Sequence, residues 1–294
     1  MKITITGSLG NVSRQLAANL INKGHQVTII SQDANKAAQI AAMGAVAAIG
    51  SVKDIAFLTS AFKGADAVYT MVPPLAASED YYEDVAVIAA NYRQALAEAG
   101  VKHVVNLSGI GAELPAGNGL SSAFYRAEDT LNQLPDIHIV HLRPGMFYTN
   151  FYGNLEMILQ QQIMGNNFPG DIPLGLVHPH DIADTAAALL SELTFTGKSF
   201  RYVTSDEKTG AEIAAIFSRL TGQSVSWIPF PDEALQQGAM QNGFSAHMAS
   251  LLMQVGVSIR EGRLFAGYAN NKVITGKRKF EAFAGEMMNT VVNG

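Results

Sequence analysis

Short hydrophobic runs alternate with longer stretches of helical periodicity over the first half of the chain. The hydrophobic runs predict six strands, at residues 2–6, 25–31, 46–49, 67–71, 103–108 and 137–143. Helices are predicted between them at residues 15–23, 35–43, 55–62, 82–99 and 121–134. Strands that alternate with helices in this way require right-handed crossovers and form a parallel sheet with helices on both faces. We therefore expect an α/β fold of the doubly wound, Rossmann type.

The rhythm changes beyond Pro144. Helices are predicted at residues 151–164, after Asp181 and at 209–220, with a loop rich in glycine and proline at 165–175. Residues 199–204 and 225–229 are predicted to be strands, the first in the same sheet, and the methionine-rich segment 232–265 to be mostly helical. We expect a sheet domain over residues 1–150 and a smaller, mostly helical cap over 151–294, with residues 176–204 partly returning to the sheet. A ligand pocket is expected between them, at the carboxyl ends of the strands.

The first predicted strand ends in a turn that is typical of a phosphate-binding loop. Gly7 allows a tight turn, Gly10 lets main-chain N–H groups approach a pyrophosphate, and the following helix contributes its positive end. A glycine pair alone is a weak signal, and Ser13 stands where a third glycine is often found. Its position at the first strand of an alternating chain nevertheless indicates a dinucleotide site. The predicted contacts in this turn are Gly7, Ser8, Leu9, Gly10, Asn11 and Val12.

The end of the second predicted strand bears on which dinucleotide is bound. An acidic residue there favours NAD, and a basic residue favours the extra phosphate of NADP. Ser31 leaves room and a hydroxyl for a phosphate, Gln32 can donate a hydrogen bond, and Lys36 follows one helical turn later. Asp33 would repel a phosphate if it pointed inward, but it also suits the N-cap of the next helix. We favour NADP(H) as the cofactor and leave NAD(H) as the alternative.

Composition limits the other possibilities. The net charge is −5 and lysine and arginine are scattered, so neither nucleic acid nor an anionic membrane is an expected partner. There is no cysteine, which removes disulfides, thiolate metal sites and cysteine nucleophiles. Gly7 interrupts the first hydrophobic run too early for a signal peptide, and no apolar stretch reaches the length of a membrane span. We expect a soluble cytoplasmic protein without membrane insertion.

The chain resembles the NmrA-like atypical short-chain dehydrogenases along essentially its whole length. The resemblance rests on the turn at 6–13, on segments 65–68, 100–103, 142–147 and 180–183, and on Ser108 and Asn150. The C-terminal part is similar to that of the bacterial quinone reductases and triphenylmethane reductases of this family. Those proteins carry an NADP-directed arginine where Gln32 stands, so this departure weakens the preference for NADP.

Typical short-chain dehydrogenases use a Tyr-x-x-x-Lys pair on the helix after the fifth strand for proton transfer. That helix contains Tyr125, but position 129 is Asp, so the pair is missing. Arg126 stands where NmrA-like proteins often place a lysine. Ser108, Tyr125 and Arg126 are therefore the candidate catalytic residues. The alternatives are that Ser108 only stabilises a turn and that Tyr125 and Arg126 form a surface pair.

The resemblance also implies contacts to the nicotinamide half of the cofactor. Ser108 would face the nicotinamide ring. The remaining residues would lie along the cofactor or hold its carboxamide, and they are Met71, Val72, Pro73, Pro144, Gly145, Met146 and Phe147. Hydride transfer from a nicotinamide needs mainly orientation from the protein, and quinones and cationic dyes accept hydride with little acid assistance.

Aromatic residues follow the sixth predicted strand. Phe147, Tyr148 and Phe151, with Tyr152 beside them, suit stacking on a flat acceptor. A packed hinge between the two parts of the chain is an equally good interpretation, because aromatic residues are as common in cores as in pockets. The methionines of the C-terminal part, Met240, Met248 and Met253, with Phe244, suit either an adaptable lid or core filler.

Two other kinds of site are disfavoured. His178, His180 and Asp181 lack a further ligand segment, so we predict no metal and expect Asp181 to cap the following helix. Ser108 is not part of a Gly-x-Ser-x-Gly motif, which argues against a serine hydrolase.

We therefore expect an NAD(P)H-dependent reductase, monomeric or homodimeric, acting on a quinone-like or other flat, electron-poor small molecule. The alternative is a non-catalytic NADP(H)-sensing regulator that binds a protein partner, because the Tyr-x-x-x-Lys pair is missing. A closed apolar pocket beside the nicotinamide favours the enzyme, and an exposed apolar patch favours the regulator.

Overall fold

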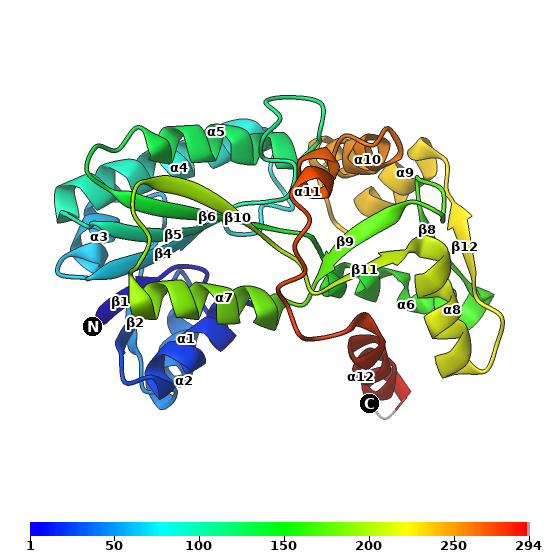
Figure 1. Cartoon of the computed structure of the whole chain (residues 1–294), viewed down its shortest axis with the longest axis horizontal. Helices are drawn as coiled ribbons and strands as arrows, with labels where there is room; N and C mark the ends of the chain where they lie inside the picture. Colours follow the sequence, from blue (N-terminus) through cyan, green and yellow to red (C-terminus); the bar gives the residue numbers. More distant parts are fainter. Residues whose placement is uncertain (293–294) are drawn as a thin grey trace.

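A seven-stranded parallel sheet forms one half of the molecule (Figure 1). The computed structural model describes residues 1–292. The strand order is β10-β6-β5-β4-β1-β2-β3. Strands β2 and β3 are added on one side of β1 and the later strands on the other side, so the strand order reverses between β1 and β4. The strands are β1 Lys2–Ile5, β2 Gln26–Ser31, β3 Val46–Ile49, β4 Ala67–Met71, β5 His103–Leu107, β6 His138–Pro144 and β10 Lys198–Val203. This order confirms the predicted doubly wound α/β fold, including the strand expected near residues 199–204.

Helices cover both faces of this sheet because successive strand residues point to opposite sides. On β1, Ile3 and Ile5 pack against α1 and α7, whereas Thr4 on the other face donates a hydrogen bond to the carbonyl of Ala61 in α3. One face carries α1 Ser13–Asn22, α2 Ala37–Ala42 with the short 3-10 helix η1 Ala34–Lys36 before it, and α7 Pro179–Glu192. The other carries α3 Ile55–Phe62, α4 Tyr81–Ala99 and α5 Ser121–Asn132.

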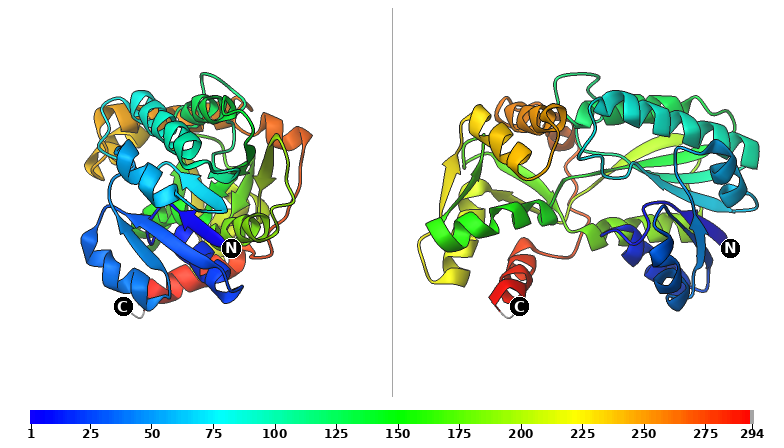
Figure 2. Two further views of the ribbon diagram at one scale, coloured as in Figure 1. Left: turned by 90° about the vertical axis from the view of Figure 1, so that its left-hand side faces the viewer. Right: turned by 180° about the vertical axis from the view of Figure 1, so that it is seen from behind.

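The C-terminal half has its own core, which is rich in aromatic side chains. Its strands form two small sheets that are separate from the large sheet (Figure 2). Strand β9 Pro173–Val177 lies between β7 Met146–Phe147 and β11 Asp206–Thr209, and β8 Ile163–Asn166 pairs with β12 Ser226–Pro229. The helices are η2 Tyr148–Asn154, α6 Leu155–Gln161, α8 Gly210–Thr221, α9 Asp232–Gln241, α10 Ala246–Arg260, α11 Ala266–Asn270 and α12 Phe280–Val292. Helix α10 also packs against α4 and α5, so it joins the two halves.

The predicted loop at 165–175 is wrong at both ends, because β8 and β9 extend into it. Gly165 and Gly175 lie inside these strands and do not mark turns, whereas Gly170 lies in the turn between them. A Cβ atom on Gly165 would lie 1.9 Å from the carbonyl oxygen of Ile228, so the glycine permits close approach of β12. The helix predicted at 151–164 likewise ends at Gln161, before β8.

The predicted N-cap at Asp181 is also wrong. Helix α7 begins at Pro179, and the side chain of His178 accepts the capping hydrogen bond from the amide of His180 (3.0 Å). Asp181 lies in the first turn, where it is buried and accepts hydrogen bonds from Ser205 Oγ (2.5 Å) and the guanidinium of Arg278. Burial and the long-range partners determine its place, and neither is visible in the local sequence.

Candidate functional site

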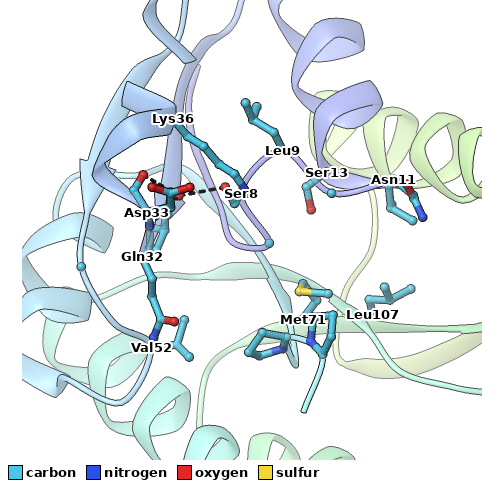
Figure 3. A pocket seen from close by; sticks show the side chains of 18 of the residues that line it. Ser8, Leu9, Asn11, Ser13, Gln32, Asp33, Lys36, Val52, Met71 and Leu107 are labelled. Atoms are coloured by element: carbon cyan, nitrogen blue, oxygen red, sulfur yellow. Dashed lines mark hydrogen bonds between the residues drawn. The ribbon is translucent and has the colours of Figure 1, made fainter. Parts of the chain in front are cut away.

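A cavity of about 560 Å³ lies at the carboxyl ends of β1 to β4, where the strand order reverses (Figure 3). Ligands of open parallel sheets bind at this position. The figure shows the turn after β1, with Leu9, Asn11 and Ser13, on one side of the cavity and Met71 and Leu107 on the other. We call this space the first cavity. Its lining includes these predicted cofactor contacts: Gly7, Ser8, Leu9, Gly10, Asn11, Val12, Ser31, Gln32, Lys36, Met71, Pro73 and Phe147.

The turn after β1 has the geometry of a phosphate cradle. Gly7 has a φ of 90° and Ser8 a φ of 51°, both in the left-handed region, and the amide of Gly10 donates to the carbonyl of Gly7 (3.1 Å). Ser13 begins α1 and donates its hydroxyl to the carbonyl of Thr6 (2.9 Å). A Cβ atom on Gly7 would lie 2.4 Å from Ser13 Oγ. The hydroxyl of Ser13 therefore stabilises the turn through its bond to Thr6, and the N-terminal end of α1 faces the cavity.

Polar side chains after β2 form the other end of this cavity. Ser8 donates a hydrogen bond from its hydroxyl to Ser31 Oγ (2.8 Å), which links the two loops. Gln32 donates from its amide to Ser51 Oγ (2.7 Å), and Asp33 caps η1 by accepting from the amide of Asn35 (3.0 Å). The side chain of Lys36 runs from η1 toward Ser8 (Figure 3). The capping role that the sequence suggested for Asp33 is thus confirmed. Lys36 places a flexible cation in this part of the lining.

A second cavity, of about 350 Å³, adjoins the first. Met71, Leu107 and Phe147 line both cavities, so the two spaces share a wall. The rest of the second cavity is lined mostly by apolar side chains from several elements, and its polar side chains are Ser108, Ser121 and Asn150. The predicted cofactor contacts that line it, besides the shared wall, are Val72, Ser108, Pro144, Gly145 and Met146.

Ser108 belongs to a buried ionic network behind the second cavity. Its amide donates to the carbonyl of Leu142 (2.8 Å), and its hydroxyl donates to Glu128 Oε1 (2.5 Å). Arg143 donates to both oxygens of Glu128, at 2.9 and 2.6 Å, and to Glu113 Oε2 at 3.2 Å. Burial by itself would lower the pKa of Arg143, but the hydrogen bonds and charge of Glu128 raise it above its usual value. Arg143 is therefore a fixed cation between two carboxylates.

Two of the candidate catalytic residues lie outside both cavities. Tyr125 is 40% exposed, and Arg126 lies 5.8 Å from the ring centre of Tyr82. The inner face of α5 instead presents Phe124 and Glu128, which are separated by one helical turn. Tyr125 and Arg126 therefore lie at the surface, as the alternative interpretation of the sequence expected.

The aromatic residues after β6 separate into two groups. Phe147 lines both cavities. Tyr148 and Phe151 are buried in the C-terminal core, where both rings pack edge-on against Phe280, and Tyr148 also donates to the carbonyl of Arg278 (2.9 Å). The structure therefore does not bring Tyr148 and Phe151 to the cavity with Phe147. Their buried position agrees with the alternative interpretation of these residues as a packed hinge.

Several lining residues were not predicted, because they come from segments without a motif. In the first cavity they include Ile30, Gly50, Val52, Pro74 and Leu107, which lie near or beyond the carboxyl ends of their strands. In the second they include Ile110, Leu120, Phe124, Leu252, Val255 and Leu264. Glu128 had one usable signal, since a carboxylate among the apolar positions 124, 127 and 131 of an amphipathic helix needs a buried partner.

Within residues 1–292, no group of three or more histidine, aspartate or glutamate side chains is placed to hold a metal ion. In the same part of the chain, no helix combines the length and the apolar composition that crossing a membrane requires.

The sheet, the glycine turn and the cavity at the switch point define a nucleotide-binding protein of the Rossmann class. The chain belongs to the NAD(P)H-binding family, whose sequence model matches residues 7–193. Two curated relatives are reductases. One, from Streptomyces griseus, is a (4-alkanoyl-5-oxo-2,5-dihydrofuran-3-yl)methyl phosphate reductase, 27% identical over 75% of this chain and 74% of its own. The other, from Xenophilus azovorans, is an NAD(P)H azoreductase, 24% identical over 86% and 85%.

Solved structures share the fold over nearly the whole chain. The NADPH-dependent quinone oxidoreductase of Escherichia coli in complex with NADPH has a TM-score of 0.82 at 23% identity, covering 97% of this chain and 99% of its own. The triphenylmethane reductase of Citrobacter in complex with NADP(H) has a TM-score of 0.76 at 22% identity, covering 90% and 91%. The negative transcriptional regulator NmrA in complex with NADP has a TM-score of 0.78 at 17% identity, covering 100% of this chain and 97% of its own. These similarities, at 17–23% identity, show a shared fold and agree with the resemblance to NmrA-like proteins.

Proposed function

We propose that the protein is an NAD(P)H-dependent reductase in which the cofactor occupies the first cavity and a flat, electron-poor acceptor occupies the second. The observation that carries this proposal is the shared wall of Met71, Leu107 and Phe147. A dinucleotide whose pyrophosphate lies on the turn after β1 would bring its nicotinamide to this wall. An acceptor in the second cavity would then lie against the ring.

NADPH is the favoured cofactor, with NADH as the alternative. Ser8, Ser31 and Lys36 offer two hydroxyls and a cation where the adenosine ribose is expected. Asp33 also lines the first cavity, and its carboxylate is held at the start of η1 by the amide of Asn35. The NADPH bound to the quinone oxidoreductase and the NADP bound to NmrA are consistent with this preference.

The acceptor is proposed to be a quinone-like small molecule. The apolar lining of the second cavity suits a flat ring, and its described lining contains no charged side chain. The relatives that reduce azo compounds and quinones support the same acceptor class.

The reaction would transfer a hydride, which carries two electrons, to the acceptor while the oxidised cofactor is released. For a quinone, a hydride and a proton from water give the hydroquinone. The bound reduced nicotinamide would supply the hydride, and the chain would supply orientation and an apolar cavity. The segment after β5 is joined to the end of β6, because the amide of Ile110 donates a hydrogen bond to the carbonyl of Pro144 (3.1 Å), and both residues line the second cavity.

The proposal is tested by following oxidation of NADPH and NADH with a panel of quinones and triarylmethane dyes. We expect acceptor-dependent loss of the reduced cofactor, faster with NADPH. Val255→Trp on α10 should fill the second cavity and slow turnover without weakening NADPH binding. Gln254→Trp, at the neighbouring position outside the cavity lining, is the matched control.

A non-catalytic NADP(H) sensor is the second candidate, favoured by the positions of Tyr125 and Arg126 outside both cavities and by the fold shared with NmrA. Tight cofactor binding without turnover of any acceptor in the panel would support the sensor and contradict the reductase.

A further inference from the structure

We propose that Glu128 is a positioning residue that makes Ser108 a hydrogen-bond acceptor toward the second cavity. The acceptor substrate would then carry a neutral N–H or O–H group that faces Ser108. This inference rests on the proposed function, since it concerns the molecule that occupies the second cavity.

The direction of the Ser108 hydroxyl follows from its partner. A serine hydroxyl has a single hydrogen, and an ionised carboxylate only accepts hydrogen bonds. Ser108 Oγ lies 2.5 Å from Glu128 Oε1, and both residues are buried, with 4% and 6% of their surface exposed. The hydrogen therefore points to Glu128 and away from the cavity, which leaves the oxygen lone pairs for a ligand.

Arg143 keeps the Glu128 carboxylate in the acceptor-only form. It donates to both carboxylate oxygens, in the bidentate arrangement that arginine makes with an ionised acid. Arg143 is held in turn by Glu113 and by the ring of Phe200, whose centre lies 4.0 Å from its guanidinium carbon. The direction of the Ser108 hydrogen bond is thus determined by a network anchored on β6 and β10.

The rest of the cavity gives this hydrogen bond its selectivity. Ser121 and Asn150 are the other polar side chains among its described lining residues. A carbonyl oxygen placed against Ser108 would meet lone pairs, whereas an amine or hydroxyl would donate to them. In a largely apolar cavity an unmatched polar group costs more than it would in water. Ser108 consequently orients the acceptor but holds no proton to give to it, so a proton consumed in the reaction comes from water.

Two naphthoquinones of similar shape test the selectivity: 2-amino-1,4-naphthoquinone, which carries a neutral donor, and 2-methyl-1,4-naphthoquinone, which does not. Their dissociation constants would be measured by calorimetry on the protein saturated with NADP⁺, so that no turnover is needed. We expect the amino compound to bind about five- to tenfold more tightly, the size of one net hydrogen bond.

The variants separate positioning from general structure. Ser108→Ala should abolish the preference. Glu128→Met should bring the ratio of the two dissociation constants close to one, because the freed hydroxyl of Ser108 can then donate to a carbonyl. Glu113→Gln is the matched control, since it alters the same arginine without touching Ser108, and it should keep the wild-type ratio. If Glu128→Met fails to fold, the double variant Glu128→Met with Arg143→Met removes the ion pair as a unit.

Equal affinities in the wild type, or an unchanged ratio in Ser108→Ala, would overturn the inference. A preference that disappears in Ser108→Ala but persists in Glu128→Met would remove Glu128 from the account. Failure of both compounds to bind would overturn this inference and the proposed acceptor site together. Absence of NADPH oxidation with an intact preference would refute the reductase alone.

Discussion

The two adjoining cavities are built in different ways. The first is made largely by the chain segments that follow β1, β2 and β4, with backbone conformation at Gly7 and Ser8 giving its shape. The second is made by side chains from the loop after β5, from α5, from β7 and from α10, and it is supported by the buried ion pair of Arg143 and Glu128. A backbone site can be recognised from a short motif, whereas a side-chain site depends on tertiary packing.

The largest effect should come from breaking the network behind the second cavity. Arg143→Met should lower the free energy of unfolding by about 3–5 kcal/mol, because the buried carboxylate of Glu128 loses its cation. Chemical denaturation measures this change. Lys53→Met, which breaks the exposed pair with Asp84 (2.7 Å), should cost less than about 1 kcal/mol. Equal losses in the two variants would show that the network is not a special support of the second cavity.

Acidification should weaken the sheet beneath both cavities through His141. Burial lowers the pKa of His141 to about 4. Its Nδ1 accepts from Asn106 (3.0 Å) and its Nε2 donates to Asn132 (3.1 Å) when the ring is neutral. The unfolded chain binds the proton more readily, so this stability is present above pH 6.5 and is lost as the pH falls toward 4, by up to about 3 kcal/mol.

Unfolding measured as a function of pH tests this linkage. His141→Gln can keep both hydrogen bonds without titrating, and it should flatten the dependence between pH 4 and 6.5. A slope that is unchanged in this variant would assign the acid sensitivity to other groups.

The first cavity should be broken selectively at Gly10. Gly10→Val places a branched side chain where the pyrophosphate is expected, and its Cβ atom would lie 3.1 Å from the carbonyl oxygen of Gly7. We expect NADPH affinity to fall about 100-fold, equivalent to the loss of one or two hydrogen bonds to a charged group. Calorimetry measures the affinity, and Gly153→Val, at a glycine whose Cβ would meet nothing within 4 Å, is the control. Unchanged affinity in Gly10→Val would remove the phosphate from this turn.

A smaller change should sharpen the cofactor preference. Lys36→Ala removes the cation of the first cavity, and we expect NADPH to bind about tenfold more weakly while NADH binding stays the same. Lys63→Ala, an exposed lysine outside the lining of this cavity, should leave both affinities unchanged. An equal loss for the two cofactors would place Lys36 away from the extra phosphate.

The smallest effect is expected at the outer face of α5. Tyr125→Phe and Arg126→Gln should each change kcat and KM by less than about twofold, because their side chains lie outside the two cavities. Steady-state kinetics with NADPH and a quinone provide the test. A large loss of kcat in either variant would restore these residues as catalytic candidates.

The sequence predicted the sheet and the turn after β1 because both depend on local patterns, the alternation of Ile3 and Ile5 and the spacing of Gly7 and Gly10. It did not predict the Ser108–Glu128–Arg143 network, whose members come from three elements and meet only when the helix packs on the sheet. The position of Asp181 was missed for the same reason, since its partner Arg278 is far along the chain. Even the glycine of β8 was misleading, because close approach of another strand and a turn favour the same residue.

We expect an acceptor in the second cavity to receive hydride from a cofactor in the first. This transfer is tested most directly with NADPH that carries deuterium at the transferring position of C4 and a triarylmethane dye, because the central carbon of the dye keeps a transferred deuterium. Mass spectrometry of the reduced dye should show one deuterium with the wild-type protein and a much lower yield with Val255→Trp. Reduced dye without deuterium, or an undiminished yield when the second cavity is filled, would contradict the account.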